Sequence, residues 1–259
     1  MSDPRHAWQL ERRADGGQVW QVPDGWQQGR GAYGGLVTAA LVAAMAEVSG
    51  DRPLRSLMAT LCGPAMVGEA EVEVLGLREG SKLSALTATL KQGGVVAHGV
   101  GVTGEARADD RRWLTLSWPD PAPWQGGMLL PPGAAPVFTQ NFEYEPLFGF
   151  PHTGDAPTSG GWVRLRGGQG PLDAALITAL IDAWWPGAFV TLPAPRPMGT
   201  VATTIDLLPV PEGMDASQPV FLRVQLLAGA EGHLVEQRDL WTQSGQLLAV
   251  NHQTQALIR

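Results

Sequence analysis

The stretch Ala40-Leu-Val-Ala-Ala-Met-Ala-Glu47 recurs in similar form 135 residues later as Ala175-Leu-Ile-Thr-Ala-Leu-Ile-Asp182, which indicates a duplicated structure. Both stretches are apolar on nearly every side, whereas a helix on a protein surface carries a polar face. A helix of this kind is stable when the rest of the protein covers it all round. The sequence therefore predicts two buried helices.

The segments that follow the two predicted helices are also alike. Each helix precedes several strand-like segments joined by turns that contain glycine, so residues 34–105 and 171–258 carry the same order of elements. The same structural unit is thus predicted to occur twice. Positions that recur at a common offset of 152 are Val72, Gly80, Leu83, Gly93 and Ala97, matched by Val224, Gly232, Val235, Gly245 and Ala249.

The composition is that of a globular protein. The chain has 259 residues, 44% of them hydrophobic and 17% charged, which excludes a disordered chain. Its longest apolar run, around Leu36–Met45, is far shorter than the roughly 20 residues that cross a bilayer. The net charge of −7 argues against a nucleic-acid surface, and a single cysteine, Cys62, fits a reducing compartment. No apolar signal segment begins the sequence, so we expect a cytoplasmic protein.

Each copy is predicted to combine one buried helix with a run of antiparallel strands, which is an α+β pattern. The domain prediction is residues 1–105, a linker over 106–135 that is rich in Pro, Trp and Gly, and residues 136–259. In the first copy we expect a helix at 36–48 and strands at about 54–62, 69–78, 82–92 and 94–104. In the second copy we expect a helix at 172–181 and strands at about 137–142, 161–166, 200–208, 219–229, 233–242 and 246–258.

Several familiar chemistries find no support in the sequence. A Gly-x-Ser-x-Gly elbow and a Walker loop are both missing. The one Gly-x-Gly-x-x-Gly match, Gly99–Gly104, lies in a predicted strand with no helix after it, so we interpret it as a chance match. The five histidines lack the spacing of metal ligands. We therefore expect no metal and no cofactor.

Three polar residues of the second copy remain as candidates. Asp182 is a carboxylate at the end of an apolar helix, where the helix dipole disfavours negative charge. Thr204 lies in a predicted strand, and Gln253 lies in the last one. A solvated helix end and an exposed sheet face would explain the three residues equally well. Period-two geometry puts Thr204 on the face opposite to that of Thr203 and Ile205.

Comparison of the two copies favours a functional reading of these residues. At the matched positions the first copy has Glu47, Thr60 and Gly101. An acid, a hydroxyl and an amide therefore occur together only in the second copy. Such a set suits the activation of water, with the carboxylate as general base and the other two groups orienting the water.

These features resemble the double-hotdog acyl-CoA thioesterases of the acyl-CoA thioesterase II type and the wider thioesterase-like superfamily. In a hotdog, an antiparallel sheet wraps around one central helix. The resemblance covers nearly all of the chain from about Gly31. The motifs that carry it are Gly31-Ala-Tyr-Gly-Gly35, Gly161-Trp-Val-Arg-Leu-Arg166, Ala179-Leu-Ile-Asp182 followed by Pro186, Thr203-Thr-Ile-Asp206, and Gly245-Gln-Leu-Leu-Ala-Val-Asn-His-Gln253.

The resemblance implies a tandem hotdog and hydrolysis of an acyl-CoA, in lipid metabolism, to a free acid and CoA. The family's catalytic trio falls on Asp182, Thr204 and Gln253. The backbone N–H of Gly34 or Gly35, at the start of the first helix, is expected to polarise the thioester carbonyl. Tight packing of the helix start against the sheet is the other reading of these glycines. By resemblance we also expect a homodimer or homotetramer.

Some features depart from the family or leave alternatives open. Met58 stands where some thioesterases of this type have histidine, and Gly63-Pro64 stands where Arg-Pro is common, so the acyl group is left open. Arg30, Arg55 and Arg164 are candidates for CoA phosphates and equally ordinary surface charges. A hotdog that binds acyl-CoA or another apolar ligand without turnover is the alternative function. Enoyl-CoA hydration is disfavoured because no histidine follows Asp182 closely.

Overall fold

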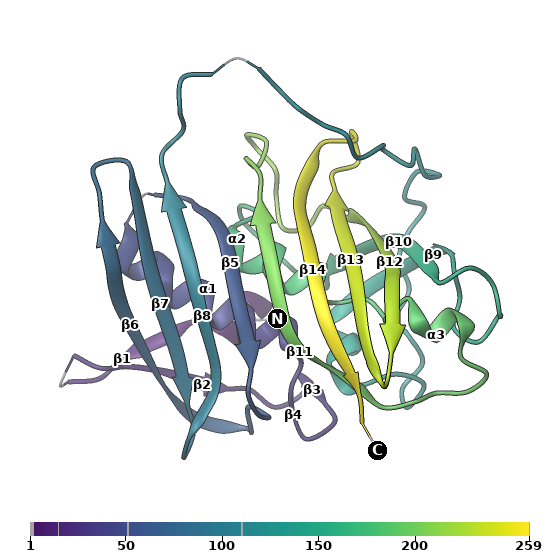
Figure 1. The fold of residues 1–259 in the computed structure, drawn as a ribbon, viewed down its shortest axis with the longest axis horizontal. Coiled ribbons are helices and arrows are strands. Elements are labelled where there is room, and N and C mark those ends of the chain that lie inside the picture. Colours follow the sequence, from purple (N-terminus) through teal and green to yellow (C-terminus); the bar gives the residue numbers. More distant parts are fainter. Residues whose placement is uncertain (1–2, 15, 51, 110, 259) are drawn as a thin grey trace.

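The computed structural model describes residues 3–14, 16–50, 52–109 and 111–258. Within them, one twelve-stranded antiparallel sheet runs through the whole molecule, with two helices packed on one of its faces (Figure 1). The strand order is β1-β2-β6-β7-β8-β5-β11-β14-β13-β12-β10-β9, and β3 and β4 form a separate pair.

The first half of the sheet surrounds one long helix. The elements of the first half of the chain are a 3-10 helix at Pro4–Trp8, β1 (Leu10–Arg12), β2 (Gln18–Val22), β3 (Gln27–Gln28), β4 (Gly31–Ala32), α1 (Gly34–Ser49), β5 (Leu54–Leu61), β6 (Gly68–Glu79), β7 (Leu83–Lys91) and β8 (Val95–Gly104).

The second half repeats this order with a shorter helix. Its elements are a 3-10 helix at Val137–Asn141, β9 (Phe142–Phe148), β10 (Thr158–Leu165), α2 (Ala174–Ile181), α3 (Ala188–Thr191), β11 (Met198–Leu207), β12 (Val220–Ala230), β13 (His233–Trp241) and β14 (Leu247–Leu257). Residues 105–136, which join the halves, contain no helix or strand among their described positions and cross over the ends of the strands from β8 toward β9 (Figure 1).

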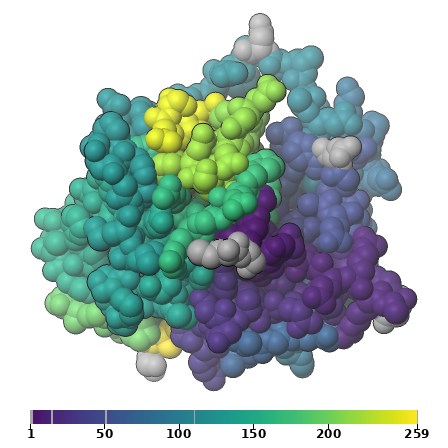
Figure 2. All heavy atoms as spheres, turned by 180° about the vertical axis from the view of Figure 1, so that it is seen from behind, coloured from purple at the N-terminus to yellow at the C-terminus, as the bar shows by residue number. Residues whose placement is uncertain are grey.

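The two halves join where β5 pairs antiparallel with β11, so their sheets are continuous. Behind the sheet, α1 and α2 lie against each other and belong to one hydrophobic core. Seen from the helix side, the purple N-terminal residues and the teal and green residues of the second half cover this face (Figure 2). The fold is α+β, a tandem hotdog, as the resemblance implied.

The contact between the helices depends on Gly35. A Cβ at this position would meet the Ala179 carbonyl oxygen at 2.9 Å and the Asp182 Cβ at 2.9 Å. Only a residue without a side chain lets the first turn of α1 approach the end of α2 so closely. Gly35 is thus tightly packed, but against α2 rather than against the sheet as the sequence reading had it, and this contact fixes Asp182 beside the start of α1.

Two local predictions were wrong. Residues 137–142 begin with a 3-10 helix, because Pro136 precedes it as N-cap and its carbonyl accepts the N–H and the hydroxyl of Thr139. The second helix begins at Ala174 rather than at Leu172, because the Asp173 side chain caps it by accepting the N–H of Leu176 at 2.8 Å.

The structural correspondence of the two halves also differs from the sequence offsets. Both helices follow an N-cap residue, Tyr33 in one and Asp173 in the other, which gives an offset of 140 instead of 135. The bulge in β11 lies 146 residues after the bulge in β5, and the bulge in β12 lies 150 residues after the bulge in β6, so these strands are equivalent at those offsets. The offset of 152 holds for β8 and β14, because Leu90 pairs with Ala97 and Leu240 with Ala249.

Candidate active site

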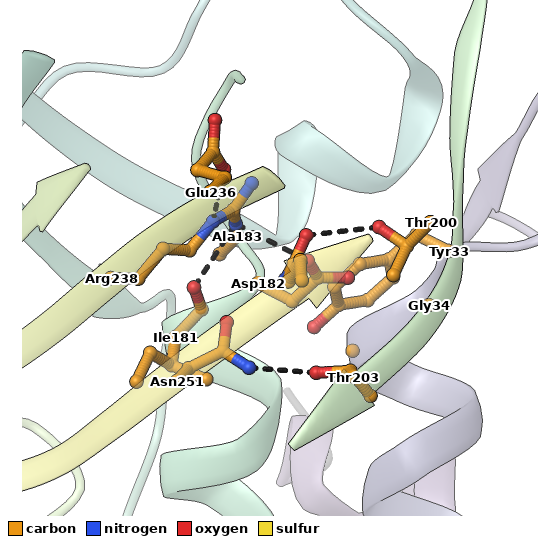
Figure 3. Close-up of polar contacts among 12 residues, drawn as sticks. Tyr33, Gly34, Ile181, Asp182, Ala183, Thr200, Thr203, Glu236, Arg238 and Asn251 are labelled. Carbon is orange, nitrogen blue, oxygen red and sulfur yellow. Dashed lines mark hydrogen bonds and ion pairs between the residues drawn. The ribbon is translucent and has the colours of Figure 1, made fainter. Parts of the chain in front are cut away.

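Asp182 lies at the C-terminal end of α2, as its C-cap residue, and its side chain is 14% exposed. Its Oδ1 accepts hydrogen bonds from Gln253 Nε2 at 2.7 Å and from Arg238 Nη1 at 3.2 Å. Its Oδ2 faces α1, at 2.9 Å from where a Cβ on Gly34 would lie. One carboxylate oxygen is thus held by the second half, and the other faces the first half (Figure 3).

Gln253 is buried in β14 and its side chain links the carboxylate to further polar groups. Its Oε1 accepts hydrogen bonds from Thr200 Oγ1 at 3.0 Å and from Gln255 Nε2 at 3.0 Å. Since the oxygen is engaged by two donors, the amide nitrogen is directed at Asp182. The structure therefore brings together two of the three residues that the sequence nominated.

Thr204, the third nominated residue, does not reach them. It pairs with Met58 and His252, and all three line a depression on the outer face of the sheet, away from the helices. The inner face carries Thr203, whose Oγ1 accepts a hydrogen bond from Asn251 Nδ2 at 2.7 Å (Figure 3). The correction follows from the two-residue period of a strand, because Thr203 shares its face with the buried Ile205.

The first turn of α1 supplies backbone donors beside Asp182. Tyr33, the N-cap, makes no side-chain capping bond, and the N–H groups of Gly34 and Gly35 precede the first intrahelical bonds. Gly34 lines a cavity with Asp182, whereas Gly35 lies against α2. Of the two glycines, Gly34 is the one next to the carboxylate.

A buried ion-pair network, which the sequence analysis missed, supports Asp182 from behind. Arg238 is 1% exposed, and its Nη1 also donates to the Ile181 carbonyl at 3.1 Å. Its Nε donates to Glu236 Oε1 at 2.8 Å, and Glu236 Oε2 accepts the Gly187 N–H at 2.6 Å. The guanidinium thus offsets both the burial of the carboxylate and its unfavourable place at the negative end of α2 (Figure 3).

The only two tyrosines of the chain brace the same end of α2. Tyr33 OH donates to the Ala179 carbonyl at 3.2 Å, and Tyr144 OH donates to the Ala183 carbonyl at 2.9 Å. Burial raises the pKa of both phenols well above the ordinary value, and the Asp182 charge adds to the effect on the Tyr33 pKa. Both side chains therefore stay neutral donors, and the carbonyls on either side of Asp182 are fixed.

Two cavities meet at Asp182. One, of about 10 Å³, is close to the size that admits a single water molecule, and it lies among Asp182, Gln253, Thr203, Thr200 and Gly34. The other, of about 410 Å³, also reaches Asp182 and has mostly apolar walls. Among the residues that line the larger cavity are Met128, Leu130, Phe138, Tyr144, Phe150, Trp184, Trp185, Phe189 and Met198.

The remaining predicted groups lie elsewhere. Arg164 pairs with Glu143 and stacks on Trp124, Arg30 is exposed, and Arg55 lies at the opposite end of the helix pair. Among the described residues, no cluster of His, Cys, Asp or Glu could hold a metal ion. Of the helices in the described part of the chain, none is long and apolar enough to span a membrane.

A signal for the missed ion pair was present in the sequence. Glu236 and Arg238 alternate on one face of a strand with the fully buried Leu240, and a charge on a buried face requires a partner. The same period separates Asn251, Gln253 and Gln255, which are all buried. A polar stripe of this kind on the core side of two adjacent strands indicates a functional network rather than a solvated face.

Comparison with known families places the chain in one of them. The family of the acyl-CoA thioesterase C-terminal domain matches residues 109–257, and that of the acyl-CoA thioesterase N-terminal domain matches residues 22–104. The chain belongs to the acyl-CoA thioesterase family. Among curated proteins, no relative of the sequence is found.

Solved structures of similar fold cover almost the whole acyl-CoA thioesterase chain. A hot dog protein of unknown function from Alicyclobacillus acidocaldarius superimposes with a TM-score of 0.87 at 23% identity, covering 98% of this chain and 97% of its own. A putative thioesterase II from Thermobifida fusca gives 0.80 at 22% identity, with 100% and 99% covered. A tesB protein from Mycobacterium avium gives 0.78 at 16% identity, with 98% and 97% covered. At these identities the likeness shows the fold.

Proposed function

We propose that this protein hydrolyses the thioester of an acyl-CoA to a free acid and CoA. The observation that carries the proposal is the convergence of Asp182, Gln253 and Thr203 on a cavity of about 10 Å³, close to the size of one water molecule. Hydrolysis requires a base, groups that orient water and a donor for the carbonyl oxygen. The site contains candidates for each of these roles.

In the proposed step, Asp182 accepts a proton from water while the water oxygen attacks the thioester carbon. The Gln253 amide holds Oδ1 in place at 2.7 Å, which leaves Oδ2 for the water. Thr203, with Thr200 nearby, supplies the hydroxyl that the sequence had assigned to Thr204. The tetrahedral intermediate then collapses, the C–S bond breaks, and the thiolate of CoA leaves and takes up a proton.

The Gly34 N–H is the proposed donor to the carbonyl oxygen. It belongs to the first turn of α1, where N–H groups lack intrahelical acceptors and the helix dipole favours negative charge. An oxyanion that forms at this point gains a hydrogen bond that strengthens as charge develops. A side chain at Gly34 would project to within 2.9 Å of Asp182 Oδ2 and block the site.

The apolar cavity of about 410 Å³ is the proposed site of the acyl group. It opens onto Asp182 and Thr200 and is walled by aromatic and aliphatic side chains, which suits a hydrocarbon rather than a nucleotide. Binding of the acyl chain there would place its thioester beside the carboxylate. Association of the protein into dimers or tetramers stays a prediction.

Thiol release from a panel of acyl-CoAs, from short to long chains, tests this proposal. We expect turnover by the wild-type protein and a loss of about 10²- to 10⁴-fold in kcat for Asp182→Asn, because the base is removed. Asp206→Asn is the matched control, since Asp206 is exposed on the outer face of β11. Binding of acyl-CoA without turnover of any substrate would favour the non-catalytic alternative, and full activity of Asp182→Asn would exclude it as the base.

A further inference from the structure

A second large cavity lies at the opposite end of the helix pair. Its volume is about 490 Å³, within the range of roughly 300–1,000 Å³ that is typical of ligand sites. On α1 its lining begins at Val42, about 12 Å of helix beyond Gly34, where α1 meets Asp182. Its apolar walls are formed by Val42, Met45, Ala46, Leu54, Ile177, Leu207 and Val210.

This cavity is the counterpart of the candidate active site in the duplicated fold. At the helix offset of 140, Val42 corresponds to Asp182, and at the strand offset of 146, Leu54 corresponds to Thr200. Both counterparts line the second cavity. The duplication has thus kept a cavity here and replaced the groups that would activate water, so a ligand bound here would not be hydrolysed.

Two polar groups in the second cavity lack the partners that such groups normally have. Thr103, the counterpart of Gln255, is 1% exposed, and its hydroxyl makes no hydrogen bond to any described residue. Arg55, beside the bulge of β5, uses its Nε to contact the Gly104 carbonyl at 2.9 Å and forms no ion pair within the described chain. A buried unpaired hydroxyl beside an unpaired cation favours an anionic ligand with acceptor oxygens.

The other charged residues of this cavity are already engaged. Asp173 accepts the Leu176 N–H and is directed at its own helix. Arg52 donates to the Gly80 carbonyl and to Ser84 Oγ, both at 2.8 Å, and lies 3.9 Å from Glu105. Arg55 is therefore the cation with donor capacity to spare.

We propose that the second cavity binds an unbranched aliphatic carboxylate of the fatty-acid class. The alkyl chain packs along Val42, Met45 and Ile177, and the carboxylate accepts hydrogen bonds from the Arg55 guanidinium and the Thr103 hydroxyl. This binding is independent of the hydrolytic chemistry at Asp182, and it would let a free acid occupy the chain at a site remote from the reaction.

The NMR signals of the methionine methyl groups report ligand binding in each of the two cavities separately. Met45 lines the second cavity, whereas Met128 and Met198 line the first. Decanoate titrated into methyl-labelled protein is expected to shift the Met45 signal in a saturable manner. Saturation of the Met128 and Met198 signals without any change at Met45, or no change at all up to the solubility of decanoate, would overturn the proposal.

Three variants test the position and the chemistry of the site. Ala46→Trp fills the second cavity and should abolish the Met45 response, while Val48→Trp, on an exposed neighbouring position outside it, should retain it. Arg55→Gln should weaken decanoate binding at least tenfold and leave the binding of decan-1-ol within twofold. Equal effects of Arg55→Gln on both ligands would refute the carboxylate assignment, and a retained Met45 response in Ala46→Trp would refute the location.

Discussion

At one end of the helix pair Asp182 is hydrogen-bonded to Gln253, whereas at the other end the corresponding positions hold Val42 and Gly101. The contrast extends to the strands behind them. Through the strand registers, Glu236, Arg238 and Asn251 correspond to Leu86, Ala88 and Gly99. One end carries a connected set of polar side chains, and the other carries aliphatic side chains and glycines in the same framework.

The polar side chains at the Asp182 end depend on one another for hydrogen-bond and ion-pair partners. An unpaired carboxylate, guanidinium or amide in a core costs several kcal/mol, so each member of the set needs the others. At the apolar end the space of the missing amide is filled by Met45, whose sulfur would overlap a Cβ at Gly101. The two ends thus fill the same framework differently, and at the apolar end the Thr103 hydroxyl has no hydrogen-bond partner among the described residues.

Removal of the central cation should have the largest effect on stability. Arg238→Met leaves Glu236 buried without its guanidinium partner, and we expect the free energy of unfolding to fall by about 3–5 kcal/mol. Arg166→Met, at an exposed position, should stay within about 0.5 kcal/mol. Chemical denaturation measures both. A loss below about 1 kcal/mol for Arg238→Met would mean that the polar end does not depend on its network.

Introduction of a single polar residue at the apolar end should destabilise the protein less than loss of Arg238 and should not increase hydrolysis. Gly101→Gln restores the amide at the position of Gln253 but collides with Met45, so we expect a loss of about 1–3 kcal/mol from overpacking and no increase in thioester hydrolysis. Gly94→Gln is the control, because a Cβ there meets no atom within 4 Å. An increase in hydrolysis rate would show that the apolar end needs only one group to become active.

The threonine pair of β11 tests which face of the strand carries the chemistry, with a smaller effect. Thr203→Val should lower kcat about tenfold, equivalent to about 1.4 kcal/mol, because the hydroxyl beside the small cavity is lost. Thr204→Val, on the outer face, should change kcat less than twofold. The reverse result in steady-state kinetics would restore the original assignment of Thr204.

The sequence was enough to predict the α+β fold, but not to identify every residue that faces the candidate active site. Apolar helices and period-two strands predicted the α+β fold. Asp182 was found as a carboxylate at the end of an apolar helix, and Gln253 because the first copy has Gly101 at the matched position. Thr204 was chosen over Thr203 by motif, although the buried neighbours Ile205 and Leu207 mark the inner face. The alternation of Glu236 and Arg238 with Leu240 indicates buried charges, but the contact of Arg238 with Asp182 arises from tertiary packing between β13 and α2 and is not visible in either local pattern.

The offsets of the repeat illustrate the same limit. Alignment of the two copies by residue similarity matched Glu47 with Asp182 and Thr60 with Thr204. Alignment by the helix N-caps and the strand bulges instead matches Val42 with Asp182 and Met58 with Thr204. Glu47 instead receives hydrogen bonds from Gln18 and Arg12 at the surface. Helix starts and bulges are therefore better markers of a duplication than residue identity in apolar runs.

The most direct test of a single active end is the acyl-CoA hydrolysis rate of Asp182→Val, which gives the polar end the residue of the apolar end. If the chemistry occurs only at Asp182, kcat falls by about 10²- to 10⁴-fold while the protein remains folded by circular dichroism. If more than a tenth of the wild-type kcat remains, the thioester is hydrolysed elsewhere, and the assignment of one active end is contradicted.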